Sequence, residues 1–215
     1  MNKRKSRLNQ IAIALTIVLI LRVLIVILME YRFYFPPDFD QSFFLAGRRP
    51  SFTGWYSVGF YTHIISGPFA IVLVVTLLVT GNSKRFKQLH RWSGRSLTLI
   101  TILAVCPGGI IMATRSQAGP IAGWGFGALA ICTLGSVALT AVLAFKKRFK
   151  SHSAWAWRSG ILLCSPIVLR LGTGLFYVTG LESPNTYRFL AWSSWLLPLL
   201  IFEGVQRFKN QKVKQ

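Results

Sequence analysis

Six long apolar segments constrain the fold of this chain more than any other feature of its sequence. A helix that crosses the hydrocarbon core of a bilayer needs about 20 mainly apolar residues. Because lipid offers no hydrogen-bond partners to an open backbone, we expect every such segment to be helical. The segments cover approximately residues 11–29, 55–80, 97–113, 124–145, 160–180 and 190–208.

The predicted fold class is therefore all-α, an integral membrane six-helix bundle in which residues 1–215 form a single transmembrane domain. The composition agrees with this prediction, since 53% of the residues are hydrophobic and only 14% are charged. The stretches between the apolar segments are short. This organisation excludes a soluble catalytic domain, a Rossmann unit and a nucleotide-binding loop.

Basic residues outnumber acidic residues by 25 to 5. Most of the basic residues fall at the N-terminus, in the loops 82–96 and 146–159, and in the C-terminal tail. Because cytoplasmic loops retain Lys and Arg, the sequence predicts an inner (plasma) membrane protein with both termini in the cytoplasm. We expect the inner loops to attract anionic lipid headgroups. The dispersal of the charge argues against nucleic-acid binding.

The two basic loops have similar sequences and each precedes an outward-running segment. The first contains Arg85-Phe86-Lys87, His90, Trp92 and Arg95, and the second contains Arg148-Phe149-Lys150, His152, Trp155 and Arg158. The similarity predicts two parallel hairpins that repeat one another. It also places His90 and His152 at the same inner level of the membrane.

Short motifs around these loops resemble a family of bacterial predicted membrane proteins that are catalogued as a domain of unknown function. The motifs are Thr62-His63-Ile64, Gly67-Pro68, His90-Arg91-Trp92-Ser93-Gly94-Arg95, Gly108-Gly109, the glycines from Gly123 to Gly127, His152 with Trp155 and Arg158-Ser159, and Leu169-Arg170. The resemblance covers about residues 55–175 and implies a central four-helix unit. Ser153 stands where the family usually has Arg. The resemblance implies positions but no activity.

Haem b is the concrete cofactor that the inner histidines suggest. It needs two axial imidazoles from facing helices at one depth, and His90 and His152 meet this requirement. Arg95 and Arg158, together with Arg91, are candidates to pair with the propionates. The alternative for both histidines is hydrogen bonding to backbone or lipid phosphate at the interface.

Four ionisable residues inside the apolar segments form a second group of candidates. An ionisable side chain within a membrane helix is costly, so it usually faces a bundle interior or a cavity. The group consists of Arg22, His63, Arg170 and Glu203. Glu203 is the only carboxylate inside a segment, and we expect it to pair with Arg22 or Arg170. The other arginine would then bind a carbonyl cluster, a water or an anionic ligand. His63 would be either a hydrogen-bonded histidine of the bundle or part of a proton or ligand site.

Prolines and glycines inside the segments predict kinks and close helix packing. Kinks are expected at Cys106-Pro107-Gly108-Gly109, at Ser165-Pro166 and at Gly67-Pro68. Gly119, Gly123 and Gly127 are spaced four apart, which allows close helix approach within the chain or, alternatively, in a homodimer. The three cysteines, Cys106, Cys132 and Cys164, lie inside segments without metal-ligand spacing, so no metal site is predicted.

These observations leave three functions open. The first is a membrane-embedded binding or redox protein that holds a bis-histidine haem b at the inner face. The second is a transporter or lipid-handling protein with a cavity lined by Arg and His, and the third is a membrane scaffold without a ligand. The residues assign no catalytic role to any side chain, so the sequence leaves open whether the protein is an enzyme.

Overall fold

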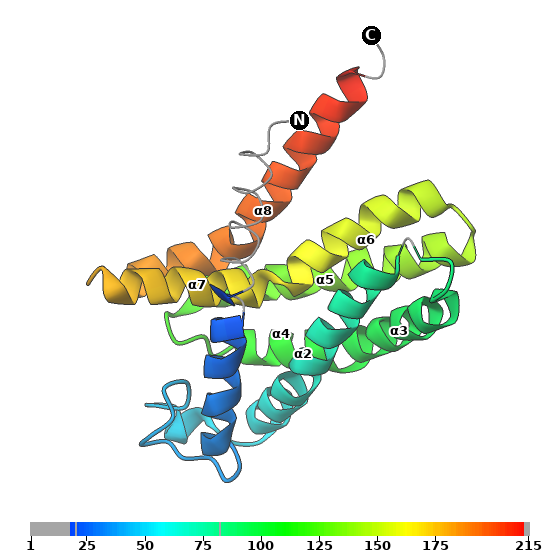
Figure 1. The fold of residues 1–215 in the computed structure, drawn as a ribbon. Coiled ribbons are helices and arrows are strands. Elements are labelled where there is room, and N and C mark those ends of the chain that lie inside the picture. The colour runs from blue at the N-terminus through cyan, green and yellow to red at the C-terminus, as the bar shows by residue number, and fades with distance from the viewer. Residues whose placement is uncertain (1–17, 20, 82, 213–215) are drawn as a thin grey trace. The chain divides into compact units, whose positions relative to one another are not determined.

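The computed structural model describes residues 18–19, 21–81 and 83–212. In this part of the chain the backbone is helical apart from turns and one isolated bridge between Tyr34 and Pro37 (Figure 1). The chain divides into two compact units, Met1–Phe52 and Thr53–Gln215. Of the first predicted segment, residues 11–29, the structure describes residues 18–19 and 21–29, which are helical, and the rest lies outside the described residues.

The first unit folds its loop around one carboxylate. Residues 21–30 are helical and are followed by the short helices η1 (Tyr31–Phe33) and η2 (Arg49–Ser51). Glu30 accepts hydrogen bonds from Ser42 Oγ at 2.8 Å and from the backbone N–H of Phe44 at 3.1 Å. These bonds tie the loop back to the end of the helix.

The second unit contains the remaining helices. They are α2 (Trp55–Thr80), α3 (Lys87–Ile100), the π-helical turn η3 (Thr101–Val105), α4 (Cys106–Ala113), α5 (Pro120–Phe145), α6 (Phe149–Leu163), α7 (Ser165–Val178) and α8 (Pro184–Lys212). Five continuous runs are long and apolar enough to cross a membrane: Trp55–Thr80, Lys87–Ala113, Pro120–Phe145, Phe149–Val178 and Pro184–Phe208. These runs confirm five of the predicted segments as apolar helices.

Two helices begin well before the apolar segments that they contain. The third and fifth segments were expected to begin near residues 97 and 160, but their helices begin at Lys87 and Phe149. Hydropathy marks where a helix enters lipid, but the helical backbone can begin earlier, at the membrane surface. Lys and Arg side chains in those first turns are long enough to keep their charges in water. Both loop histidines therefore lie on helices.

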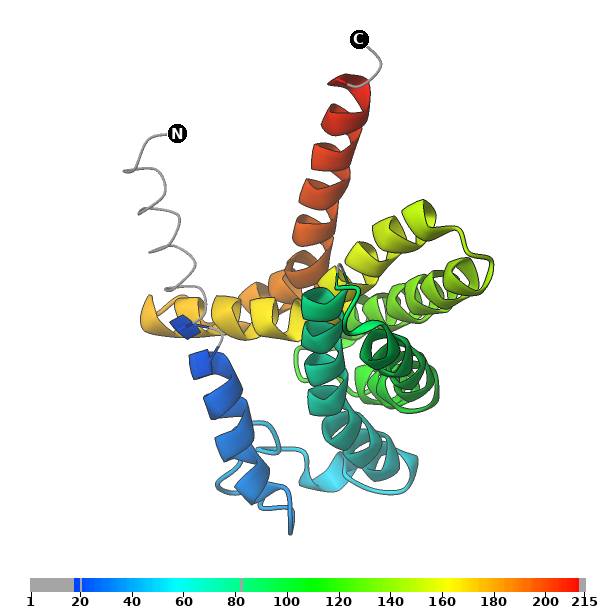
Figure 2. The ribbon, with the colours of Figure 1, turned by 45° about the vertical axis from the view of Figure 1, so that its right-hand side comes forward.

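The core of the second unit lies between α2, α3, α5 and α6. Its buried cluster consists of Ala70, Val74, Leu97, Val137 and Leu163. Helix α2 packs against α3 and α4, α5 packs against α6, and α8 packs against α5 and α7. Figure 2 shows the hairpin that α5 and α6 form, with α8 extending away from it.

Proline residues interrupt two of the membrane helices. The π-helical turn Thr101–Val105 stands immediately before Cys106-Pro107, and the helix breaks at Cys164 before Pro166. A proline lacks the N–H that an α-helix needs at that position, so the local hydrogen-bond pattern changes. In contrast, α2 continues through Pro68 as one helix.

Small residues allow the helices to approach closely. A Cβ added at Gly108 would lie 2.7 Å from the carbonyl oxygen of Gly59 on α2. A Cβ at Gly123 would lie 2.5 Å from the carbonyl oxygen of Ala113, whereas nothing lies within 4 Å of one at Gly127. Of the three spaced glycines, Gly123 thus serves packing within the chain.

The contact between α2 and α4 gives a stability prediction. We expect Gly108→Ala to lower the free energy of unfolding by about 1–3 kcal/mol, because the added methyl group forces two backbones apart. Gly127→Ala is the matched control and should have little effect, since its Cβ meets open space. Thermal unfolding of the purified protein in detergent measures both. Equal midpoints for the two variants would contradict the packing described above.

Candidate functional site

The two hairpins of the second unit place their histidines in the same register. His90 is the fourth residue of α3 and His152 is the fourth residue of α6. Each backbone N–H donates to the carbonyl of the residue before its helix, Phe86 or Arg148, at 2.9 Å. The repeated loop sequence therefore builds the same helix start twice.

Each imidazole is also bound to a threonine on the preceding helix. His152 Nδ1 lies 2.9 Å from the carbonyl oxygen of Thr140, and His90 Nδ1 lies 3.1 Å from Thr80 Oγ1. The Thr80 hydroxyl donates its own proton to the Thr76 carbonyl at 2.6 Å. The Thr140 carbonyl can only accept, so the neutral His152 ring carries its proton on Nδ1 and keeps the lone pair on Nε2. Thr80 Oγ1 can accept from His90 Nδ1 in the same way, and the Leu77 backbone is a further hydrogen-bond partner of His90.

The two imidazoles lie near enough for their charges to interact. Within the described residues, no group of three or more His, Cys, Asp or Glu side chains could hold a metal ion. One end of the second unit therefore carries two imidazoles in the same register.

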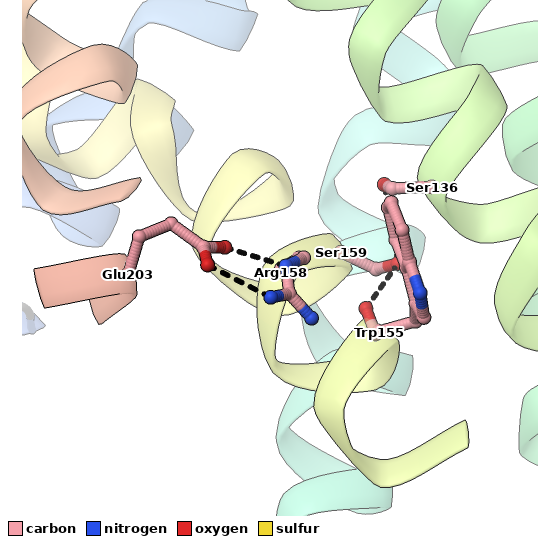
Figure 3. Close-up of polar contacts among 5 residues, drawn as sticks. All are labelled: Ser136, Trp155, Arg158, Ser159 and Glu203. Carbon is pink, nitrogen blue, oxygen red and sulfur yellow. Dashed lines mark hydrogen bonds and ion pairs between the residues drawn. The ribbon is translucent and has the colours of Figure 1, made fainter. Parts of the chain in front are cut away.

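Glu203 and Arg158 form an ion pair between α8 and α6. Arg158 donates through Nε to Glu203 Oε1 at 2.5 Å and through Nη2 to Oε2 at 2.8 Å, and both side chains are largely buried (Figure 3). The guanidinium carbon also lies 4.9 Å from the Trp155 ring centroid and 5.5 Å from that of Phe202. This arrangement fixes α8 to α6.

The prediction that Glu203 pairs with Arg22 or Arg170 was therefore wrong. The depths along the helices explain the error. Glu203 lies near the C-terminal end of the run Pro184–Phe208, and Arg158 lies in the first half of the run Phe149–Val178, which starts on the same side, whereas Arg170 lies toward the opposite end of that run. Comparing the depths of Glu203 and Arg158 in the sequence could have identified this pair.

A chain of hydroxyl groups joins α5 to α6 beside this ion pair. Ser159 Oγ lies 3.2 Å from Ser136 Oγ and donates to the Trp155 carbonyl at 3.0 Å (Figure 3). It also lies 3.1 Å from Thr140 Oγ1. Thr140 is also the residue that holds His152. These hydroxyls were not predicted from the sequence, although hydroxyl residues at matching depths on neighbouring segments are a signal for such a network.

The arginines predicted to contact propionates differ in their surroundings. Arg95 lies 5.4 Å from the Trp92 ring centroid and has an exposed side chain. Arg158 makes the equivalent stack on Trp155 but also binds Glu203. Both hairpins therefore contain an Arg–Trp stack. Of the two arginines, Arg158 also contacts α8, through Glu203.

His63 joins α2 to the interrupted helix. Its Nδ1 lies 2.8 Å from the carbonyl oxygen of Val105, the last residue of the π-helical turn. A Cβ at Gly109 would lie 3.3 Å from the imidazole, so glycine is needed for this approach.

Arg170 lies on α7 with an exposed side chain, near enough for its charge to interact with His63. Arg22 is also exposed and belongs to the first unit.

The helices and their polar contacts define a multi-pass helical membrane protein. The chain belongs to the family described as "Predicted membrane protein (DUF2306)", whose model matches residues 60–205. The resemblance seen in the sequence was expected to end near residue 175. The matched region extends further and includes most of α8. No curated protein and no solved structure matches the chain.

The ion pair between α6 and α8 can be tested by a double-mutant cycle. We expect Arg158→Leu and Glu203→Leu each to destabilise the protein by about 2 kcal/mol, because each leaves a largely buried charge without its partner. The double variant should recover most of this loss, since no unpaired charge remains. Unfolding midpoints measured in detergent give the loss of stability for each single variant and for the double variant. Strict additivity of the two single losses would show that the groups do not interact.

Proposed function

We propose that this protein is a membrane-embedded redox protein that binds haem b between His90 and His152. The observation that carries the proposal is the matched pair of imidazoles. Each lies at the fourth position of its helix, and each Nδ1–H is held by an acceptor on the preceding helix.

The hydrogen bonds at Nδ1 suit axial ligation. A histidine that binds iron through Nε2 commonly donates its other N–H to a carbonyl or a similar acceptor, which fixes the ring and raises its basicity. Thr140 provides a carbonyl and Thr80 provides a hydroxyl that has already donated its proton. Both Nε2 lone pairs are left to bind iron. Bound haem would supply reversible one-electron chemistry at this end of the bundle.

Arginines near the inner helix starts would bind the propionates. Arg91 and Arg95 lie on α3, and both side chains are exposed. Arg158 has two of its donor nitrogens on Glu203, so we assign it to positioning α6 rather than to a propionate. In this proposal the ion pair holds the helix that carries His152.

We also propose that the haem end of the bundle faces the cytoplasm of a cell with an inner (plasma) membrane. The basic loops that precede α3 and α6 support this orientation, because cytoplasmic loops retain Lys and Arg. The same loops would contact anionic lipid headgroups. An even number of spans would then place both termini in the cytoplasm.

Absorption spectra test the haem proposal. The protein, expressed with an adequate haem supply and purified in detergent, should show a Soret band that shifts on reduction with dithionite, together with sharp α and β bands. His90→Asn and His152→Asn should each abolish this low-spin spectrum, because the amide can replace the donor at Nδ1 but not the ligand at Nε2.

His63→Asn is the matched control for the spectra. It removes the third imidazole of the chain, which lies near the other end of α2, and it should leave the haem spectrum unchanged. A colourless parent protein would reject the proposal. An intact low-spin spectrum in both His90→Asn and His152→Asn would reject these residues as ligands.

Cysteine labelling of intact cells tests the orientation. Lys147→Cys lies in the loop between α5 and α6, and Glu182→Cys lies in the loop between α7 and α8. A membrane-impermeant maleimide should label Glu182→Cys in intact cells and Lys147→Cys only after lysis. The parent chain, whose cysteines lie within the spans, gives the background. Labelling of Lys147→Cys but not of Glu182→Cys in intact cells would show that the topology is the reverse of the one proposed.

A further inference from the structure

The two hairpins carry equivalent Arg–Trp stacks in different surroundings. Trp92 and Arg95 on α3 have the same spacing as Trp155 and Arg158 on α6. The guanidinium carbon lies 5.4 Å from the ring centroid in the first stack and 4.9 Å in the second. The second stack receives an anion from α8, because Glu203 binds Arg158 through both oxygens. Among the described residues, Arg95 forms no hydrogen bond or ion pair.

The other carboxylates of the chain have partners elsewhere or lie on the opposite side of the bundle. The sequence contains five acidic residues, of which Glu203 is one. Glu30, Asp38 and Asp40 accept hydrogen bonds within the first unit. Glu182 lies in the loop between α7 and α8, on the side of the bundle opposite to the start of α3. An anion that completes the stack of Arg95 would therefore come from outside the chain.

Arg95 lies inside a membrane-spanning run. It follows the start of α3 at Lys87 by eight residues, which is about 12 Å along the helix. A charged side chain at such a position is costly unless it is paired or reaches the membrane surface. The phosphate groups of lipids are the anions that a basic site at this level of the bilayer meets.

An apolar groove begins beside Arg95. It lies between α2 and α3, which pack against each other, and it has a volume of about 570 Å³. Its lining includes Phe69, Val72 and Leu73 on α2, Ser96 and Leu99 on α3, and Leu103 in η3. Ser96 is the residue after Arg95, and Leu99 lies one turn further along the same side of the helix. From Ser96 to Leu103 the groove extends about 10 Å away from the basic end, toward the middle of the span.

We propose that Arg95 and this groove bind one anionic phospholipid from the leaflet that the basic loops face. The guanidinium would donate to the phosphate, for which its planar geometry is suited, and an acyl chain would lie in the groove. The phosphate would have the role beside Arg95 that the Glu203 carboxylate has beside Arg158. Arg91 is exposed one turn before Arg95, and its charge favours a head group with a net negative charge.

The lipid site does not depend on haem. Of the two arginines that the haem proposal places near the propionates, Arg91 remains available when Arg95 binds a lipid. The site also differs from a general attraction between the basic loops and anionic lipid, because it requires one particular arginine and one particular groove.

Native mass spectrometry of the full chain measures the retained lipid. The protein in neutral maltoside micelles is titrated with dioleoyl phosphatidylglycerol or with dioleoyl phosphatidylcholine, which has the same acyl chains and no net charge. We expect one molecule of phosphatidylglycerol to be retained, and phosphatidylcholine to bind more weakly. Equal retention of the two lipids would overturn the proposal.

Arginine variants test the phosphate contact. Arg95→Gln should weaken phosphatidylglycerol binding by about tenfold or more, because a charge-assisted hydrogen bond is lost. Arg95→Lys should keep part of the affinity. Arg148→Gln removes an exposed arginine at the start of α6, so it is the matched control and should bind normally. An equal loss in Arg95→Gln and Arg148→Gln would show a general attraction to the loops and would overturn the site.

Tryptophan variants test the position of the acyl chain. Val72 is exposed and lines the groove, so Val72→Trp should fill it and weaken binding. Val75 is also exposed on α2 but lies outside the groove lining, so Val75→Trp is the matched control. Equal affinities of these two variants would overturn the placement of the chain. Because the visible spectrum does not enter these experiments, their failure is separate from a failure of haem binding.

Discussion

The absence of water from the bilayer core is the constraint on which this structure depends. A polar group that is left unpaired in hydrocarbon costs several kcal/mol, so a partner within the protein is strongly favoured. The backbone meets this requirement as helices. Thr98 and Thr133 meet it by donating to the carbonyls of Gly94 and Leu129 one turn earlier, whereas the buried Thr101 Oγ1 and Ser165 Oγ have no partner among the described residues. The single carboxylate in the described spans, Glu203, meets it through Arg158.

The two hairpins satisfy this constraint in the same way. In each one, a histidine in the first turn of the second helix bonds back to a threonine near the end of the first, and an arginine stacks on a tryptophan. The repetition brings two equivalent imidazoles to one end of the bundle. The haem proposal rests on this pair, because haem iron can bind one imidazole on each face. The hydrogen bonds that stabilise the hairpins therefore also orient the proposed ligands.

Several features could be predicted from the sequence because they depend on local composition. Hydropathy identified the five described spans, and the prolines at 107 and 166 marked the two places where helices are interrupted. The repeated loops indicated that His90 and His152 occupy equivalent positions. The helices begin before the apolar spans, at Lys87 and Phe149, because basic residues lower the hydropathy without ending the helix. The threonines that hold the histidines were missed because serine and threonine are common in membrane helices.

The sequence by itself determined that this is a helical membrane protein, where its spans lie, and which few ionisable residues they contain. These properties follow from the length and polarity of single segments. Only the tertiary structure decided which residues meet: Glu203 with Arg158, His63 with Val105, and His152 with Thr140. Each of these contacts joins residues on different helices. Which helices face each other depends on how small residues such as Gly108 and Gly123 allow backbones to approach, and hydropathy does not encode this packing.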